Sequence, residues 1–333
     1  MRKLLLQTIG ACVALAGLSG AATAAPAIEV LGRDFQFPNV IEGMPARLSD
    51  VKGLQINSFT TNDGVKLSYW EAGQGKPLIF VPGWSANGAQ YINLIHLLAR
   101  THHVYVLDPR NQGLSQKVDV GGRIARHSMD LRELGQHLGI RSADYVGHSM
   151  GAAILWSHID LFGTTGMRKA VFVDEPISIY SHADWSEQER LEAGGTTTSP
   201  ERMVAAFTAG GPINALVTDL KVLERSQLTD SPYYRNSESF ASAFIQNDPK
   251  ALARVLFSHT VNDWRDVVRS KVDIPTAIFS GEQSTNLPSQ RWAQSVIPGA
   301  VLFSYTTAEH GDHFLMFKNP VKFTQDLRSF LER

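Results

Sequence analysis

The chain has 333 residues, of which 43% are hydrophobic and 19% are charged, and it contains a single cysteine. These values are typical of a globular protein with one large domain or two smaller ones, and they exclude a disordered or collagen-like chain. The 31 basic and 32 acidic residues give a net charge of −1. Proteins that bind nucleic acid usually carry a clustered excess of basic residues, so we expect no nucleic-acid partner.

Residues 1–24 have the pattern of a secretory signal peptide. Two basic residues at positions 2 and 3 precede an apolar stretch, which ends in the A-x-A cleavage pattern Ala-Thr-Ala at 22–24. We predict cleavage after Ala24 and a periplasmic or secreted protein. A retained membrane helix and a lipoprotein anchored through Cys12 are the alternatives. The apolar stretch is short for a membrane span and continues past Cys12, which disfavours both.

The mature chain predicted from this cleavage has different bulk properties. It contains no cysteine, and its net charge is −3. An exported protein without thiols cannot form wrong disulfides in an oxidising compartment. No later apolar run approaches the roughly 20 residues of a membrane helix, so we expect no stable membrane insertion of the mature chain. The sequence predicts no particular oligomeric state.

Short β-rich runs alternate with longer helical patterns from about residue 54 onward, which is typical of an α/β protein with a mainly parallel twisted sheet flanked by helices. The predicted strands are residues 54–60, 65–71, 77–81, 103–108, 144–147, 170–174, 275–280 and 300–305. The predicted helices are residues 90–99, 124–138, 150–159, 289–296 and 320–331. The first two strands are separated by Asn62-Asp63-Gly64 and should form a hairpin.

One long segment interrupts this alternation. Residues 177–270 show helical patterns and scattered aromatic residues but no clear buried strand. A segment of this length is too long for a structureless loop, so we predict an inserted helical cap. The α/β core would then comprise residues 54–176 and 271–333, preceded by an N-terminal extension at 25–53. The aromatic residues of the cap could form its own core or face a ligand.

The sequence Gly147-His148-Ser149-Met150-Gly151 contains the pattern G-x-S-x-G where a short apolar strand meets a helix. A sharp turn at such a junction needs small residues on both sides of the serine, and it holds the serine out above the edge of the sheet. Ser149 is therefore the candidate nucleophile. The alternative is a serine that only caps the start of the helix.

Three further motifs accompany this one. They are Phe80-Val81-Pro82-Gly83-Trp84 after a strand, the turn Asp108-Pro109-Arg110-Asn111-Gln112-Gly113-Leu114-Ser115, and His313 seven residues before Pro320. With these motifs the chain resembles the α/β-hydrolase superfamily over residues 54–331. The resemblance departs from the family pattern at Pro82, where histidine is usual, and at Asn111, where glycine is common. It implies an enzyme that needs no cofactor.

The resemblance also assigns catalytic roles. It implies that Ser149 attacks a carbonyl carbon, that the backbone N–H groups of Trp84 and Met150 bind the resulting oxyanion, and that His313 accepts the serine proton. His310 is the alternative base. A metal bound by His310 and its neighbours is a further alternative, but no other ligand cluster lies nearby in the sequence, so we predict no metal site. We expect His148 to line the pocket rather than to react.

The acid of the triad departs from the commonest family pattern. The family usually supplies an aspartate in a G-x-x-D context after the strand that follows the cap, but the matching residue here is Ser284. Serine cannot balance the charge of an imidazolium. Some family members carry the acid at the end of the strand before the cap, where this chain has Asp174. We therefore predict Asp174 as the acid, with Glu175 and Glu282 as alternatives.

These residues predict an esterase or lactonase that cleaves a small-molecule ester or lactone through a Ser-His-Asp triad and an acyl-enzyme intermediate. A serine at the elbow disfavours dehalogenase and epoxide hydrolase chemistry, for which the family uses an aspartate. Residues 121–151 and 174–176 also resemble bacterial cofactor-free haloperoxidases, which implies peracid formation as a side reaction. A non-catalytic ligand-binding protein on a hydrolase scaffold is an alternative from another class.

Overall fold

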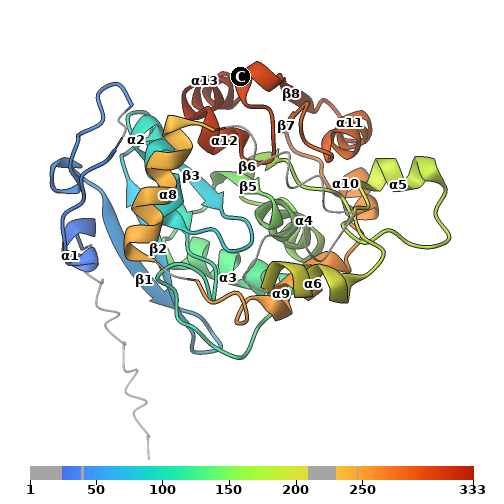
Figure 1. Ribbon diagram of the computed structural model, residues 1–333, viewed down its shortest axis with the longest axis horizontal. Coiled ribbons are helices and arrows are strands. Elements are labelled where there is room, and N and C mark those ends of the chain that lie inside the picture. Colours follow the sequence, from blue (N-terminus) through green and yellow to red (C-terminus); the bar gives the residue numbers. More distant parts are fainter. Residues whose placement is uncertain (1–24, 39–40, 209–229, 246) are drawn as a thin grey trace, which may run out of the picture.

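The computed structural model describes residues 25–38, 41–208, 230–245 and 247–333, and its centre is an eight-stranded sheet (Figure 1). The strands are β1 (Gln55–Thr60), β2 (Lys66–Ala72), β3 (Lys76–Val81), β4 (His102–Leu107), β5 (Ala143–His148), β6 (Met167–Val173), β7 (Thr276–Gly281) and β8 (Val301–Tyr305). Their order in the sheet is β1-β2-β4-β3-β5-β6-β7-β8. Only β2 runs opposite to the others, because it pairs antiparallel with both β1 and β4.

Helices cover both faces of this sheet. One face carries α2 (Ile92–Leu98), α8 (Pro232–Phe244), α12 (Leu315–Lys318) and α13 (Pro320–Leu331), and the other carries α3 (Ile124–His137), α4 (Met150–Phe162), α10 (Arg265–Ser270) and α11 (Leu287–Val296). Successive residues of a buried strand therefore enter two different cores. In β3, Leu78 and Phe80 pack in one core, whereas Ile79 and Val81 pack in the other. Both faces are apolar, as expected for a parallel sheet covered on both sides.

The predicted fold is confirmed, and all eight predicted strands are present. The hairpin between β1 and β2 is also present, where Thr61 donates its backbone N–H to Val65 O at 2.9 Å. The prediction succeeded because strands buried on both faces are continuous apolar runs bounded by polar turns.

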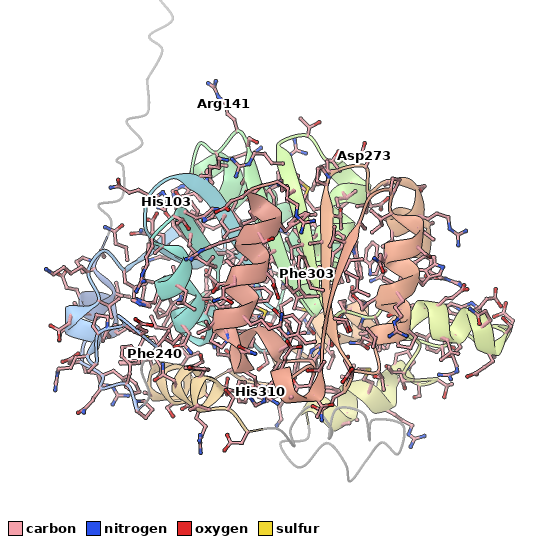
Figure 2. All side chains as sticks on the ribbon, turned by 90° about the horizontal axis from the view of Figure 1, so that it is seen from above. His103, Arg141, Phe240, Asp273, Phe303 and His310 are labelled. Atoms are coloured by element: carbon pink, nitrogen blue, oxygen red, sulfur yellow. The ribbon has the colours of Figure 1, made fainter. Side chains whose placement is uncertain are left out.

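The carboxyl ends of the parallel strands meet at one edge of the sheet. Figure 2 shows His103, Arg141 and Asp273, which lie at or before the amino ends of strands, at one end of the molecule. His310, in the loop after β8, lies at the opposite end. In open α/β sheets, ligands bind beyond the carboxyl ends of the strands, so this edge is the place to look for a functional site.

The helices of the segment 177–270 lie in different places. The segment contains α5 (Glu187–Ala193), α6 (Pro200–Thr208), α8, α9 (Ala253–Thr260) and α10, and its described residues contain no strand of the sheet. Figure 1 shows α6 and α9 side by side, whereas α8 lies next to α2 on the other side of the molecule. Residues 209–229 and 246 of the predicted cap lie outside the described residues.

The N-terminal extension packs against α8. It contains α1 (Ala27–Leu31), and its Phe35 and Phe37 rings contact the ring of Phe240 in α8, with centroids 5.2 Å apart in both pairs. Ala25 and Ala27 also form backbone hydrogen bonds with the start of β1. Residues 25–53 and α8 therefore share one apolar core. The predicted signal peptide at 1–24 lies outside the described residues.

Candidate active site

Ser149 occupies a strained turn between β5 and α4. Its backbone has φ 52° and ψ −130°, a conformation that residues with side chains rarely adopt. The two glycines of the motif permit this turn. A Cβ on Gly147 would lie 2.6 Å from the backbone nitrogen of Ala152, and a Cβ on Gly151 would lie 1.9 Å from the carbonyl oxygen of Val81. The G-x-S-x-G spacing therefore follows from the close contact of the helix start with β5 and β3.

The side chain of Ser149 does not cap helix α4. Ser149 stands at the N-cap position, but its hydroxyl makes no capping hydrogen bond. The alternative of a purely capping serine therefore has no support in the structure. Met150 is the first residue of α4, and the N–H groups of a first helical turn have no acceptor within the helix. Such a group can bind a developing negative charge beside the serine.

The loop after β3 passes directly beside Ser149. A Cβ on Gly83 would lie 2.9 Å from the Cβ of Ser149, so this position requires glycine. Trp84, the next residue, lines the same cavity as Ser149, and its indole Nε1 donates to the carbonyl of Leu252 at 3.2 Å. The loop predicted to carry an oxyanion donor is thus adjacent to the candidate nucleophile.

Gln112 holds this loop in place, and sequence analysis did not identify it. Its side chain is fully buried and donates from Nε2 to the carbonyls of Gly83 and Ala86, at 3.0 and 2.8 Å. Its Oε1 accepts the backbone N–H of Ser85 at 2.8 Å. Ser85 has a φ of 62°, so these three hydrogen bonds fix a backbone conformation that is unfavourable by itself.

Asp174 and His313 form a hydrogen-bonded pair near Ser149. Asp174 is the residue after β6, and His313 lies in the loop after β8. His313 Nδ1 lies 2.8 Å from Asp174 Oδ2, and the Asp174 side chain is completely buried. With Nδ1 directed at the carboxylate, Nε2 is the nitrogen on the opposite side of the ring. Ser149 and His313 both line one cavity.

Three further side chains donate hydrogen bonds to the Asp174 carboxylate. Ser280 donates to Oδ1, Ser284 donates to Oδ2 at 2.7 Å, and the Asn286 amide donates to Oδ2 at 3.2 Å. All three residues lie at the carboxyl end of β7 or in the loop after it. Ser284 stands where the family usually has its acid. Here it instead donates a hydrogen bond to the carboxylate of Asp174, which follows β6.

These contacts shift the pKa values of the pair in opposite directions. Burial by itself would raise the pKa of Asp174, but the hydrogen bonds from His313, Ser280 and Ser284 and the attraction of His313 outweigh it and lower the pKa. Burial by itself would lower the pKa of His313, but the hydrogen bond and the charge of Asp174 outweigh it and raise the pKa. The pair therefore favours a carboxylate next to an imidazole that readily accepts a proton.

The alternative acids lie elsewhere. Glu175 Oε1 lies 3.2 Å from Nε2 of His259 rather than next to His313. Glu282 accepts the backbone N–H of Thr307 at 3.0 Å and does not line the cavity that contains Ser149. Among the described residues, only Asp174 of these three carboxylates is hydrogen-bonded to the imidazole of His313.

The other histidines of the region have structural contacts. His148 is buried, and its Nε2 donates to the carbonyl of His313 at 2.8 Å. Burial lowers the pKa of His148 to about 3, so it is neutral at neutral pH. His310 adopts a left-handed conformation with φ 59° at the end of a short turn. Within the described part of the chain, no group of three or more potential ligands is arranged to hold a metal ion.

A mostly apolar cavity of about 320 Å³ lies at this edge of the sheet. Its volume lies at the lower end of the range for small-molecule sites. Besides Ser149 and His313, it is lined by Trp84, Glu175, Ile179, Met203, Phe207, Tyr234, Leu256, His259, Phe314 and Phe317. Of the scattered aromatic residues in the segment 177–270, Phe207 and Tyr234 line it, whereas Phe240 packs against the N-terminal extension.

Comparison with known families identifies the family of the chain. The family model for the alpha/beta hydrolase fold matches residues 76–320. The chain belongs to this alpha/beta hydrolase family. A non-heme chloroperoxidase, CPO-A1 of Kitasatospora aureofaciens, is 27% identical over 283 residues, which cover 82% of this chain and 98% of that protein. A non-heme haloperoxidase of Rhodococcus erythropolis is 26% identical over 295 residues, with the same coverage of both chains.

Solved structures of the family share the fold. The esterase RhEst1 from Rhodococcus sp. ECU1013 superposes with a TM-score of 0.66 at 20% sequence identity, and the match covers 83% of this chain and 98% of that one. The predicted resemblance to α/β hydrolases is thereby confirmed. No helix in the described parts of the chain is long and apolar enough to cross a membrane.

Proposed function

We propose that this α/β hydrolase cleaves carboxylic esters or lactones with Ser149 as nucleophile, His313 as general base and Asp174 as the acid that orients the base. The observation that carries the proposal is the 2.8 Å hydrogen bond between His313 Nδ1 and Asp174 Oδ2, formed beside a serine on a strained elbow. A carboxylate in this position fixes the tautomer of the imidazole and stabilises its protonated form.

The reaction has two similar halves. In the first, Nε2 of His313 takes the proton of Ser149 as the hydroxyl attacks the carbonyl carbon, and the protonated imidazole then gives this proton to the departing alcohol. In the second, water attacks the acyl-enzyme with His313 again as base, and the acid product leaves while Ser149 is protonated. In a lactone the leaving alcohol stays attached to the acyl group, so one molecule of hydroxy acid is released.

The tetrahedral intermediate of each half carries a negatively charged oxygen. In the proposal this oxygen is bound by the backbone N–H groups of Met150 and Trp84. Support comes from the place of Met150 in the first turn of α4 and from the close approach of Gly83 to Ser149. Loss of one such donor typically costs about 10² to 10³ in rate.

We further propose that the enzyme acts in the periplasm or outside the cell, after cleavage behind Ala24. The basic residues, the apolar stretch and the A-x-A pattern within residues 1–24 support this location. The test is to express the full chain with a C-terminal tag in a bacterial host, fractionate the cells and sequence the N-terminus. An exported product that begins at Ala25 supports the proposal, and a full-length cytoplasmic product contradicts it.

The hydrolase proposal is tested with two reagents on the same protein. Short-chain p-nitrophenyl esters measure turnover, and a fluorophosphonate probe measures the reactivity of the serine. We expect both signals from the wild type and neither from Ser149→Ala, with a loss of turnover of at least about 10⁴-fold. A wild-type protein that shows neither turnover nor labelling would instead favour a non-catalytic binding protein.

Perhydrolysis is the second candidate activity. Two relatives whose matches cover 82% of this chain are a non-heme chloroperoxidase and a non-heme haloperoxidase. Hydrogen peroxide would replace water in the second half of the reaction, so that the acyl group leaves Ser149 as a peracid, which can then oxidise a halide. Formation of peracid from a carboxylic acid and peroxide, lost in Ser149→Ala, would support this activity. Absence of peracid from an active esterase would exclude it.

A further inference from the structure

A second carboxylate and imidazole face the candidate active-site cavity, and the proposed reaction does not use them. Glu175 follows the proposed acid Asp174 in sequence, and His259 comes from α9. Both side chains line the cavity, although Glu175 is only 2% exposed and His259 only 4%. Glu175 Oε1 lies 3.2 Å from His259 Nε2.

This pair leaves hydrogen-bonding capacity unused. Oε1 of Glu175 has no hydrogen-bond partner among the described residues, because its contact with Nε2 of His259 is not aligned as a hydrogen bond. Nδ1 of His259 has no partner there either. A buried polar atom without a partner costs free energy, and native structures usually avoid that cost unless a ligand or water meets the atom. Here the carboxylate borders the cavity that a substrate would occupy.

The rest of the cavity wall makes Glu175 distinctive. It is the one carboxylate in the described wall, where neither lysine nor arginine balances its charge. The surrounding side chains are mostly apolar and include Ile179, Met203 and Leu256. The negative charge of Glu175 also contributes to the raised pKa of His313, so Glu175 lies within electrostatic reach of the proposed base.

The backbone holds Glu175 firmly. Gln290 donates a hydrogen bond from its side-chain amide to the carbonyl of Glu175, and Pro176 restricts the next peptide. Asp174, on the other side, has a φ of 50°, and its carboxylate points to His313. A carboxylate on such a fixed backbone, at the edge of a mostly apolar pocket, is suited to select a substrate by a single polar group.

We propose that Glu175, supported by His259, is a specificity-determining subsite for a substrate that carries a hydrogen-bond donor, an O–H or N–H group, on an otherwise apolar chain. The inference rests on the proposed ester hydrolysis at Ser149. The donor supplies the partner that the carboxylate lacks, whereas a substrate with a carboxylate at this place is repelled by like charge. A buried polar group discriminates strongly against a substrate that leaves it without a partner.

The test compares matched substrates. Methyl esters of straight-chain acids with four to eight carbons are prepared in three series, which end in a methyl, a hydroxymethyl or a carboxylate group, and kcat/KM is measured by acid release. For the chain length that reaches the subsite, we expect the wild type to prefer the hydroxyl series over the methyl series by about tenfold or more. The carboxylate series should be the poorest.

Variants then assign the preference to Glu175. In Glu175→Leu, we expect the hydroxyl-to-methyl ratio of kcat/KM to fall by about tenfold or more. In the isosteric Glu175→Gln, the carboxylate-to-methyl ratio should rise by about tenfold, because the like charge is gone. Glu282→Gln is the matched control, since Glu282 does not line this cavity, and it should leave both ratios unchanged. Ratios are used because any disturbance of neighbouring Asp174 affects all three series alike.

The outcomes separate the two proposals. Fluorophosphonate labelling of Ser149 confirms that each variant is folded, and Glu175→Gln carries the test if Glu175→Leu does not label. Unchanged ratios in a labelled variant that still hydrolyses the methyl series would overturn the subsite and leave the hydrolase proposal intact. A wild type that hydrolyses no ester and does not label would overturn both.

Discussion

The residues that follow β5 and β6 adopt similar backbone conformations, but different kinds of contact hold them in place. Both strands place a residue with positive φ above the sheet, Ser149 with 52° and Asp174 with 50°. At Ser149 the turn depends on glycines two residues before and after it, so the requirement is local in sequence. At Asp174 the carboxylate is held by side chains that follow β7 and β8. A candidate nucleophile of this kind can be recognised from five residues, whereas the candidate acid depends on tertiary contacts.

The largest expected effect removes the acid from this arrangement. We expect Asp174→Asn to lower kcat by about 10⁴-fold, because the amide favours the wrong tautomer of His313 and cannot stabilise its charge. Turnover of a p-nitrophenyl ester measures the effect. Glu282→Gln is the control and should keep near-normal turnover. A near-normal rate in Asp174→Asn together with an inactive Glu282→Gln would assign the role to Glu282.

A second experiment moves the acid to the position where the family usually has it. Ser284 already lies 2.7 Å from the Asp174 oxygen that meets His313. We expect the double variant Asp174→Asn/Ser284→Asp to recover about 10²-fold of the activity that Asp174→Asn loses, since a carboxylate at 284 can reach the same ring nitrogen. Ser284→Asp alone should lower the melting temperature, because two buried carboxylates then repel each other. A double variant as inactive as Asp174→Asn would contradict the exchange.

The loop beside Ser149 is tested through Gln112. Gln112→Leu removes three buried hydrogen bonds that fix the loop from Gly83 to Ala86. We expect kcat to fall by about 10- to 100-fold with a smaller change in KM, because the proposed oxyanion donor of Trp84 is no longer held in place. Gln116→Leu is the control. Gln116 accepts the backbone N–H of Lys66, away from the cavity, so a similar loss there would contradict the role of Gln112.

The pH profile gives the smallest expected effect. In the proposed reaction His313 must be neutral to accept the serine proton, and its pKa is raised above 6.5, so kcat/KM should increase with pH through an apparent pKa above this value. The contribution of His313 to the stability of the fold changes with pH in the opposite direction to kcat/KM. A raised pKa in the folded state stabilises the protein below pH 6.5, and this stabilisation is lost as the pH rises through the folded-state pKa.

Ser284→Ala sharpens the same measurement. The variant removes one hydrogen-bond donor that lowers the pKa of Asp174. The carboxylate is then held less firmly against His313 and stabilises the protonated imidazole less. We expect a few-fold loss of kcat and a downward shift of the apparent pKa of the profile by less than one unit, both measured with the same ester. An unchanged profile would mean that Ser284 contributes nothing to the charge of Asp174.

Much of the fold could be predicted from the sequence. Strands such as β3 and β5 are apolar runs between polar turns, and the small residues around Ser149 mark a sharp junction. The pairing of Asp174 with His313 could be predicted only as one of several alternatives, because Glu175 is adjacent in the chain and the direction of each side chain depends on the turn after β6.

Other features had no local signal. Gln112 lies in a turn whose motif resembles the family, but its contacts are with residues about 27 positions earlier in the chain. The packing of Phe35 and Phe37 against Phe240 joins segments about 200 residues apart, so helical periodicity could not assign α8 to the core next to the N-terminal extension. Both features depend on contacts between residues that are far apart in the sequence.

The adjacency of Asp174 and Glu175 constrains how this enzyme can evolve. One residue contacts the proposed base and the next faces the proposed substrate cavity, so a substitution at 175 that changes substrate preference would also disturb the peptide that positions 174. Met203 in α6 and Leu256 in α9 also line the cavity, but neither is next to a proposed catalytic residue in the sequence. We expect natural variation in substrate range to accumulate in those helices, while the two consecutive carboxylates change together or not at all.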